Sequence, residues 1–507
     1  MRRLLIIAFC CSYAFAVPAL VRNSSGTNTF VSTGHQSAGG GTSYTIGLPD
    51  AALSGNCVVL GFAASDNGSP AITVTDDKGG TWTQGPTAHD SANARLLQLW
   101  YSAAVTGARR VTVNFNGAFK LYLSGIVAEF YNTSCVADGG SGNTGTGTNI
   151  QAGSFSPSTT GDLVVQYGIN DTDDTVSSFT AGSQGNISWD LMSADVVQGN
   201  SSSYGNNGLT VLDSYENAAA VQWGVYNSTS ALNPQMTQSG GSANGYVSVA
   251  LALKSSGGGS DDSSALVVRS IQHLLLLNGT TSPMTVQFPC RGHLLVAAWV
   301  SGSGDDITSI ADSNGNAWIA TGPFVSQTHN YRVENAVCSS TMKVTLTFNQ
   351  TFASQGNNVF FYDIDGSGSV GATLDRDFAT TGNQGSGGNL TGASVTPTNS
   401  LGIVIGTLGV ALNGPNGTTG AGQVFDSVVW GNEPVVSSDP TAFSDELGGW
   451  AHYFNTSTAT VTFVWTEINT TDCNCFAGDW SSRATAFKAG ASTGTVLPPT
   501  MLTATVR

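Results

Sequence analysis

The chain has 507 residues, a formal net charge of −16 and only 10% charged residues, with five lysines. A surface this acidic lacks the positive patches that bind nucleic acid or an anionic membrane, so both classes of partner are excluded. Gly, Ser, Thr and Asn are abundant, whereas the Ala-, Glu-, Lys- and Leu-rich segments that build helices are missing, which favours strands and turns. The length allows two or more domains, each with its own core.

The first residues have the three parts of a secretion signal. Arg2-Arg3 form a basic start, Leu4 to Phe15 an apolar stretch, and Ala14-Phe15-Ala16 a small-x-small cleavage site. We therefore expect a signal peptide at residues 1–16. No later stretch approaches the roughly 20 apolar residues of a membrane span. The sequence thus predicts a secreted or cell-surface protein, in a compartment where disulfides persist.

A short motif occurs twice in the sequence. Thr73-Val-Thr-Asp-Asp-Lys-Gly-Gly-Thr-Trp82 is matched by Ser309-Ile-Ala-Asp-Ser-Asn-Gly-Asn-Ala-Trp318. Each copy predicts a β-hairpin, because an Asp-x-x-Gly turn separates two strand-like runs and Gly supplies the positive φ that such turns need. The Asp is interpreted as a turn former and the Trp as a core anchor. A calcium loop would require further acidic residues and a closing Glu.

Other landmarks recur in the same order, which predicts an internal duplication. Period-two alternation, as in Arg110–Phe115 and Tyr246–Leu253, predicts strands. The expected fold class is all-β, with two tandem antiparallel β-sandwich (jelly-roll-like) domains. Gly-rich stretches such as Gly139–Gly147 are expected to be surface loops. The predicted organisation is a signal peptide at 1–16, module 1 at 17–254, a flexible Gly/Ser/Asp linker at 255–264, module 2 at 265–489 and a Thr/Pro-rich tail at 490–507.

Six cysteines remain after signal removal, an even number in each module, which favours disulfides. Cys57 and Cys135 are the only possible pair within module 1. In module 2, Cys473 and Cys475 are too close along a strand-like segment to bridge each other without strain. We therefore expect each to pair with one of the other two, and the sequence does not choose which. A lone Cys-x-Cys is a poor zinc pattern. The module 2 cysteines are Cys290, Cys338, Cys473 and Cys475.

Two groups of residues are candidate binding sites. Trp100-Tyr101 has no aromatic counterpart in the second copy, so we predict a ligand-binding surface there, where rings would stack on the C–H faces of a sugar. Asp171, Asp173 and Asp174 form an acidic cluster between strand-like runs and are the candidate ligands of a structural Ca²⁺. No other cofactor is predicted.

No catalytic residue is predicted. A glycoside hydrolase needs two carboxylates held close together, and the Glu-x-Asp-x-x-Glu strand motif of jelly-roll glycoside hydrolases is absent. Glu129 and Asp363 lie on comparable strands near the end of the first part of each copy. Their shared position favours a structural role over a catalytic pair.

The repeated turn motif, the Gly161-Asp-Leu-Val-Val165 strand and the closing Ala-x-Ala-x-Lys strands together resemble uncharacterised secreted bacterial surface proteins with tandem β-sandwich modules. The tail Leu497–Arg507 resembles the opening strand of a fibronectin-type-III-like module. The resemblance implies an architecture and no residue-level activity.

Three functions are consistent with these observations. We expect a non-catalytic extracellular protein that binds glycans or matrix, or that builds cell-surface structure. One alternative is a secreted polysaccharide-active enzyme, a hydrolase or lyase. The other is a fibre subunit that self-assembles by strand exchange through its tail strand.

Overall fold

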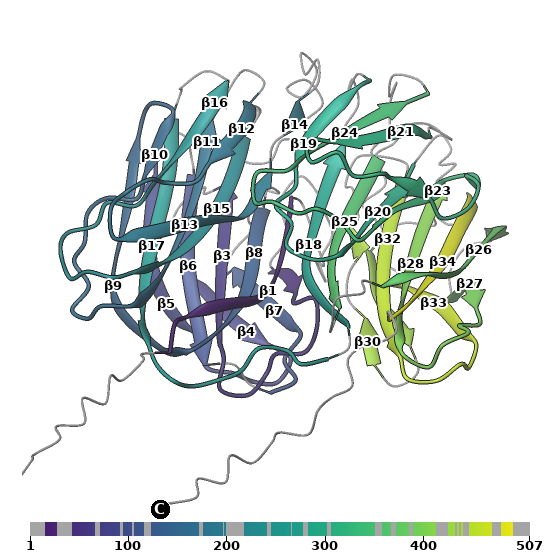
Figure 1. Ribbon diagram of the computed structural model, residues 1–507, viewed down its shortest axis with the longest axis horizontal. Coiled ribbons are helices and arrows are strands. Elements are labelled where there is room, and N and C mark those ends of the chain that lie inside the picture. Colours follow the sequence, from purple (N-terminus) through teal and green to yellow (C-terminus); the bar gives the residue numbers. More distant parts are fainter. Residues whose placement is uncertain are drawn as a thin grey trace, which may run out of the picture.

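A computed structural model describes residues 16–27, 43–65, 71–91, 95–103, 106–115, 123–171, 176–195, 197–198, 217–240, 245–264, 266–276, 282–301, 306–349, 357–366, 372–384, 389–411, 424–430, 433–435, 438–439, 446–468 and 478–489. Every regular element in these ranges is a β-strand (Figure 1). A search of the same ranges for a helix able to cross a membrane finds none. The all-β class predicted from the sequence is confirmed. We refer to residues 16–255 as the first half and to residues 266–489 as the second half.

A ten-stranded sheet crosses the molecule and joins the two halves (Figure 1). The first half contributes β1 (Ala19–Thr27), β3 (Cys57–Ser65), β5 (Thr83–Asp90), β6 (Arg95–Ala103) and β8 (Leu123–Tyr131). The second half contributes β18 (Leu266–Leu276), β20 (Leu294–Val300), β22 (Ile319–Ala320), β23 (Thr328–Glu334) and β25 (Asn357–Gly366). The strand order is β22-β23-β20-β25-β18-β1-β8-β3-β6-β5.

The two halves meet where β1 and β18, the first strand of each half, lie side by side. Asn23–Gly26 pair with Ser270–His273 in parallel, whereas every other strand pairing that the structure describes is antiparallel. Parallel neighbours cannot be joined by a tight turn. Here the whole of the first half separates them in the sequence, so this contact is invisible to local sequence patterns.

In the first half, the ten-stranded sheet is covered on both faces. A three-stranded sheet, β2-β7-β4, packs on one face, and a five-stranded sheet, β13-β15-β11-β17-β9, packs on the other. A third sheet, β10-β16-β12, covers the far side of the five-stranded sheet. The bounds are β2 (Ser43–Gly47), β4 (Ile72–Asp76), β7 (Arg110–Phe115), β9 (Thr133–Gly145), β10 (Asn149–Gln151), β11 (Asp162–Asp171), β12 (Val176–Thr180), β13 (Ile187–Asp195), β15 (Asn217–Tyr226), β16 (Gln235–Gly240) and β17 (Gly245–Ser255).

The second half has the same set of layers, and β14 of the first half joins one of its sheets. A four-stranded sheet, β14-β19-β24-β21, packs on one face of the ten-stranded sheet, and β26-β34-β28-β32-β31 packs on the other. The sheet β27-β33-β29-β30 covers the latter. The bounds are β14 (Val197–Gln198), β19 (Met284–Gln287), β21 (Ile307–Asp312), β24 (Lys343–Phe348), β26 (Thr373–Gln384), β27 (Asn389–Val395), β28 (Gly402–Ala411), β29 (Val424–Trp430), β30 (Glu433–Val435), β31 (Ser438–Asp439), β32 (Glu446–Asn455), β33 (Val461–Ile468) and β34 (Gly478–Lys488).

One order of strand pairing occurs four times. In β1 to β8, one sheet has the order first, eighth, third, sixth and fifth strand, and its partner sheet has second, seventh and fourth. The order returns in β18 to β25, in β9 to β17 when β14 is left out, and in β26 to β34 when β30 is left out. The sequence pointed to two copies of a module. The pairing order divides each half again.

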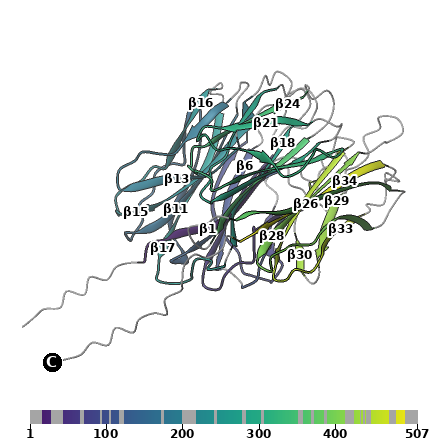
Figure 2. The same ribbon diagram turned by 45° about the vertical axis from the view of Figure 1, so that its right-hand side comes forward.

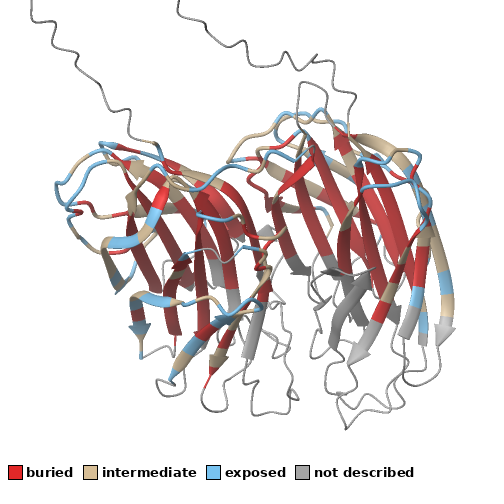
Figure 3. Ribbon diagram, turned by 90° about the horizontal axis from the view of Figure 1, so that it is seen from below, coloured by how far each residue is buried: buried red, intermediate tan, exposed pale blue. Residues whose placement is uncertain are grey.

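Side chains at the seam show how the layers of the two halves are arranged. Ser25 of β1 bonds Ser193 of β13, and Gln272 of β18, its partner in the parallel register, donates to the carbonyls of Ala194 and Gln287. The five-stranded sheet of the first half and the β19 sheet of the second half therefore lie on the same face of the ten-stranded sheet. The strands are buried along their middle portions in both halves, and the turned views show the layers (Figures 2 and 3).

The repeated Asp-x-x-Gly motif does not form a hairpin. β4 pairs with β7, whereas β5 pairs with β6 in the ten-stranded sheet, so the chain changes sheets at this turn. β21 and β22 are separated in the same way. The turn itself forms as predicted, but the strands on either side of it have other partners.

The Gly-rich stretch expected to be a loop is mostly strand. Gly139–Gly145 belongs to β9, which pairs with β17. A Cβ built on Gly142 would lie 2.2 Å from the carbonyl oxygen of Thr87 in β5. Glycine is needed there because two backbones from different sheets approach each other closely.

Candidate functional site at the seam

The largest concentration of buried charge lies beside β1. Arg22 is fully buried, and its guanidinium contacts three carboxylates: Nε lies 3.0 Å from Glu129, Nη2 2.7 Å from Asp262 and Nη1 3.5 Å from Asp50. Arg22 and Glu129 are directly opposite each other in the β1–β8 register. A buried guanidinium requires such partners, because an unpaired charge away from water is very costly.

The segment 255–264, predicted to be a flexible linker, is held against this cluster. Asp262 binds Arg22, and Asp261 binds Arg269 of β18 at 2.7 Å. Ser260 and Asn56 exchange two hydrogen bonds, and the Gly258 carbonyl accepts from the backbone of Asn132. Its composition fits a flexible chain, but these contacts fix it as a clasp across the starts of β1 and β18.

Arg269 occupies the place in the second half that Arg22 has in the first. It lies in β18 beside an irregularity in the register, and it contacts both Asp261 and Asp365 of the neighbouring β25. Arg22 also follows a register irregularity and contacts a carboxylate of the neighbouring β8. The adjacent Asp261 and Asp262 thus each bind one of the two equivalent arginines. A Val-Arg pair in each strand was the sequence signal for this arrangement.

Glu129 and Asp363 have the structural role that their shared position predicts. Glu129 accepts hydrogen bonds from the backbone of Leu53 and the amide of Asn56. Asp363 accepts from the backbone of Arg291 and Gly292. Each carboxylate therefore fixes the loop that precedes β3 or β20. Burial raises the pKa of both groups, to about 6 for Asp363, against the opposing effects of these hydrogen bonds and of nearby arginines.

His452 of β32 brings the second half to the same cluster. It is 9% exposed and interacts electrostatically with Asp50, Arg109 and Arg22 of the first half. Burial lowers its pKa to about 4, and the attraction of Asp50 does not compensate because the two arginines oppose protonation. The ring packs edge-on against Tyr362. His452 is therefore a neutral packing group at neutral pH.

A small cavity lies on the opposite face of the seam. Its volume of about 20 Å³ is room for one water molecule. Polar groups from three strands line it: Ser25 of β1, Ser193 of β13, and Gln272 and His273 of β18. Ile126 and Tyr167 complete the wall. This volume is far below the several hundred Å³ of a pocket for a sugar or another small molecule.

Asp138, within β9, and Asp162, the first residue of β11, form a close carboxylate pair. The Thr159 hydroxyl lies within hydrogen-bonding distance of both carboxylates. Asp138 also accepts a hydrogen bond from Ser158 and forms an ion pair with Lys254. Burial and the neighbouring Asp138 raise the pKa of Asp162 to about 6. Although burial opposes it, hydrogen bonding lowers the pKa of Asp138. Two carboxyl groups whose pKa values are shifted in opposite directions are typical of a catalytic acid–base pair. Here, however, the pair accepts hydrogen bonds from Ser158 and Thr159, in the loop that the pair holds in place.

The Asp residues of the repeated turns are saturated by donors of the protein. Asp76 accepts from the backbone of Lys78 and Gly80 and from the indole of Trp82. Asp312 accepts the equivalent bonds from Asn314, Asn316 and Trp318. Both Trp rings pack against the cores beneath them. This is the turn-and-anchor arrangement that the sequence predicted.

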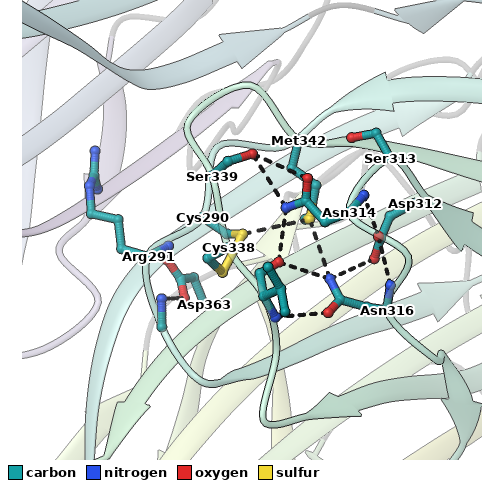
Figure 4. The surroundings of a disulfide bond; sticks show 12 residues. Cys290, Arg291, Asp312, Ser313, Asn314, Asn316, Cys338, Ser339, Met342 and Asp363 are labelled. Carbon is teal, nitrogen blue, oxygen red and sulfur yellow. Dashed lines mark hydrogen bonds between the residues drawn. A yellow bond between two sulfur atoms is a disulfide. The ribbon is translucent and has the colours of Figure 1, made fainter.

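The cysteines follow the prediction in the first half and depart from it in the second. Cys57 of β3 is bonded to Cys135 of β9. Cys290, however, is bonded to Cys338, so the prediction that each pairs with Cys473 or Cys475 is wrong. Asn314 and Asn316 bond the carbonyl of Val337 and so hold the Cys338 loop against the Asp312 turn (Figure 4). Cys473 and Cys475 lie outside the described residues. The two disulfides indicate an oxidising environment.

The predicted ligand sites gain no support. Trp100 is 7% exposed, and its indole donates to Gln98 within the core, so its ring face is not available for stacking a sugar. Tyr101 is half-buried against the neighbouring core. The acidic cluster lies outside what the structure describes, since only the backbone of Asp171 is placed and Asp173 and Asp174 are not. Among the described residues, no group of three or more His, Cys, Asp or Glu is arranged to hold a metal ion.

The sequence matches no protein-family model, and a search of curated proteins finds no match.

Proposed function

We propose that the protein is a non-catalytic secreted or cell-surface protein with a structural or matrix-binding role. The observation that best supports this proposal is the seam, where β1 pairs with β18. The two halves share one sheet, and the clasp 255–264 and the buried Arg22 cluster hold that sheet together. The buried charged side chains of this cluster, Arg22, Glu129 and Asp262, contact the protein's own loops and strands.

We further propose that the chain arose by internal duplication of a jelly-roll-like sandwich. Two observations support this. The strand order that recurs four times pairs the first strand with the eighth and the second with the seventh, as jelly rolls do. Arg22 and Arg269, and Glu129 and Asp363, also have equivalent roles at equivalent places. The repeated turn motif is a third sign of the same event.

A polysaccharide-active enzyme is the second candidate, and the Asp138–Asp162 pair is the observation in its favour. A carboxyl group with a raised pKa beside one with a lowered pKa is the pairing that glycoside hydrolysis uses. The pair is, however, engaged with Ser158, Thr159 and Lys254, and it has no described pocket beside it.

The test uses the chain from Val17 onward with a panel of insoluble polysaccharides, including cellulose, chitin and peptidoglycan. Co-sedimentation measures binding, and released reducing ends measure turnover. We expect no turnover on any substrate. Sustained sugar release that Asp162→Asn abolishes would overturn the proposal. Asp375→Asn is the matched control, because Asp375 fixes the equivalent loop through Thr398.

A further inference from the structure

The strand β1 is the first described strand, yet it occupies the centre of the widest sheet. It lies between β8 and β18, with eight residue pairs to the former and four to the latter. Without it, the ten-stranded sheet would separate into a group of five strands and a group of four. Residues 28–42 connect β1 to β2. The position between β8 and β18 is called the β1 slot below.

The side chains of β1 are unusually polar for a central strand. Arg22, Asn23, Ser24 and Ser25 are four consecutive buried polar residues, and Val21 is its only fully buried apolar side chain among those described. The buried side chains of the strand itself therefore contribute little apolar surface to the core. What binds β1 in its slot is the ladder of backbone hydrogen bonds together with the ion pairs of Arg22.

Charge makes the β1 slot selective. Glu129, Asp50 and Asp262 all face the position that the Arg22 guanidinium occupies. An extended peptide without a cation at this position would leave Glu129 and Asp262 without their guanidinium partner in a buried place. The strand that matches the slot in both register and charge is a copy of β1 itself.

The packing beneath β1 is also incomplete. The cavity of about 20 Å³ lies along its second part, where Ser25 faces Ser193 and Gln272. Interiors are normally filled, so the packing beneath the junction of β8, β1 and β18 leaves a small gap that all three strands line.

We propose that β1 is an exchangeable strand, and that the β1 slot of one copy accepts β1 from a second copy of this chain. Exchange of an identical element preserves every contact in the slot and so has little energetic cost. Reciprocal exchange gives dimers, and one-way exchange gives chains. The inference rests on the proposed structural role and names its partner. The sequence favoured strand exchange through the tail, which lies outside the described residues. The strand proposed to exchange here is β1.

Disulfide trapping between co-expressed full chains tests the proposal. Ser24 and Val127 are directly opposite in the β1–β8 register. One chain carries Ser24→Cys and the other Val127→Cys, with different affinity tags. Exchange predicts an interchain disulfide between the two tags. Val58→Cys and Ser102→Cys, opposite in the β3–β6 register, form the matched control pair for strands that do not exchange. If either variant of the first pair fails to fold, Asn23→Cys with Ala128→Cys replaces it.

Selectivity gives a second readout. A chain with Arg22→Met and Ser24→Cys must compete with the resident wild-type β1 of its partner, so the interchain yield should fall by roughly a hundredfold. Disulfides that form only when Ser24→Cys and Val127→Cys share one chain overturn the proposal. Equal interchain yields from the control pair overturn it as well, because they report unspecific association. Neither result affects the proposed non-catalytic role, which sugar release alone would overturn.

Discussion

Removal of the Arg22 side chain is the sharpest test of how the seam is held. The substitution Arg22→Met keeps most of the aliphatic volume and removes the cation from a site where both it and Glu129 are fully buried. Breaking a buried ion pair by removing one partner costs about 3–5 kcal/mol, because the other charge remains buried and uncompensated. We therefore expect Arg22→Met to lower the free energy of unfolding by about 4 kcal/mol at pH 7.

The measurement is guanidinium denaturation of the chain from Val17 onward, with two comparisons. Arg269→Met is the matched control, and its loss should be smaller because the Arg269 side chain is 16% exposed and its partner Asp261 is 43% exposed. The double variant Arg22→Met/Glu129→Leu should recover part of the loss, since the fully buried carboxylate of Glu129 is gone while the mostly buried Asp262 still lacks its partner.

The pH dependence of Arg22→Met gives a further check. Burial already raises the pKa of Glu129, and loss of the neighbouring cation raises it further. The folded state then binds a proton more readily than the unfolded state, so stability rises as pH falls through the folded pKa. A loss below about 1 kcal/mol at pH 7, or a double variant no more stable than the single one, would refute the reasoning.

Three further predictions concern the interior. The pKa of His452 is lowered to about 4, so the unfolded chain takes up the proton first, and stability is lost as pH falls from about 6.5 towards 4. The variant His452→Gln should therefore lose about 2 kcal/mol less stability than the wild type between pH 7 and pH 5. An unchanged pH slope of the denaturation midpoints would contradict this. The variant Cys57→Ala/Cys135→Ala removes a disulfide that spans 78 residues and should lower the free energy of unfolding by about 4 kcal/mol. The variant Cys290→Ala/Cys338→Ala, whose disulfide spans 48 residues, should lose slightly less. Thermal stability equal to that of the wild type would disprove the prediction. The variant Gly142→Ala places a Cβ against the Thr87 carbonyl and should lower the free energy of unfolding by at least about 1 kcal/mol. The control Gly185→Ala, whose added Cβ meets no atom within 4 Å, should change it by no more than about 0.5 kcal/mol. Equal losses for the two variants would contradict the close approach of β9 to β5.

Sequence reasoning was most successful where the deciding contacts are local. Alternation in Arg110–Phe115 predicts a strand, and the structure has β7 over those residues. Asp76 and Trp82 are six positions apart, and the bond between them is part of the turn that the motif predicts. Cys57 and Cys135 could be paired because the first half offers no other cysteine. Each of these conclusions needs only neighbouring residues or a count.

It failed where two patterns look alike along the chain but differ in space. A strand–turn–strand motif does not tell whether the second strand returns to the first or crosses to another sheet, and at Asp76 and Asp312 it crosses. A Gly-rich run is equally typical of a loop and of a strand pressed against another backbone, as in β9. The pairing of Cys290 with Cys338 depends on a contact between two loops that the asparagines of the Asp312 turn hold together.

The sequence by itself determined the all-β class, the local turns and one disulfide, because alternation, short motifs and cysteine counts are properties of the chain alone. Tertiary structure decided the parallel seam between β1 and β18, the burial of Arg22 among three carboxylates and the docking of the Asp261–Asp262 clasp. Arg22 and Asp262, for example, are 240 positions apart. Composition marked the clasp as a flexible linker, and only the packing of the two halves fixes it in place.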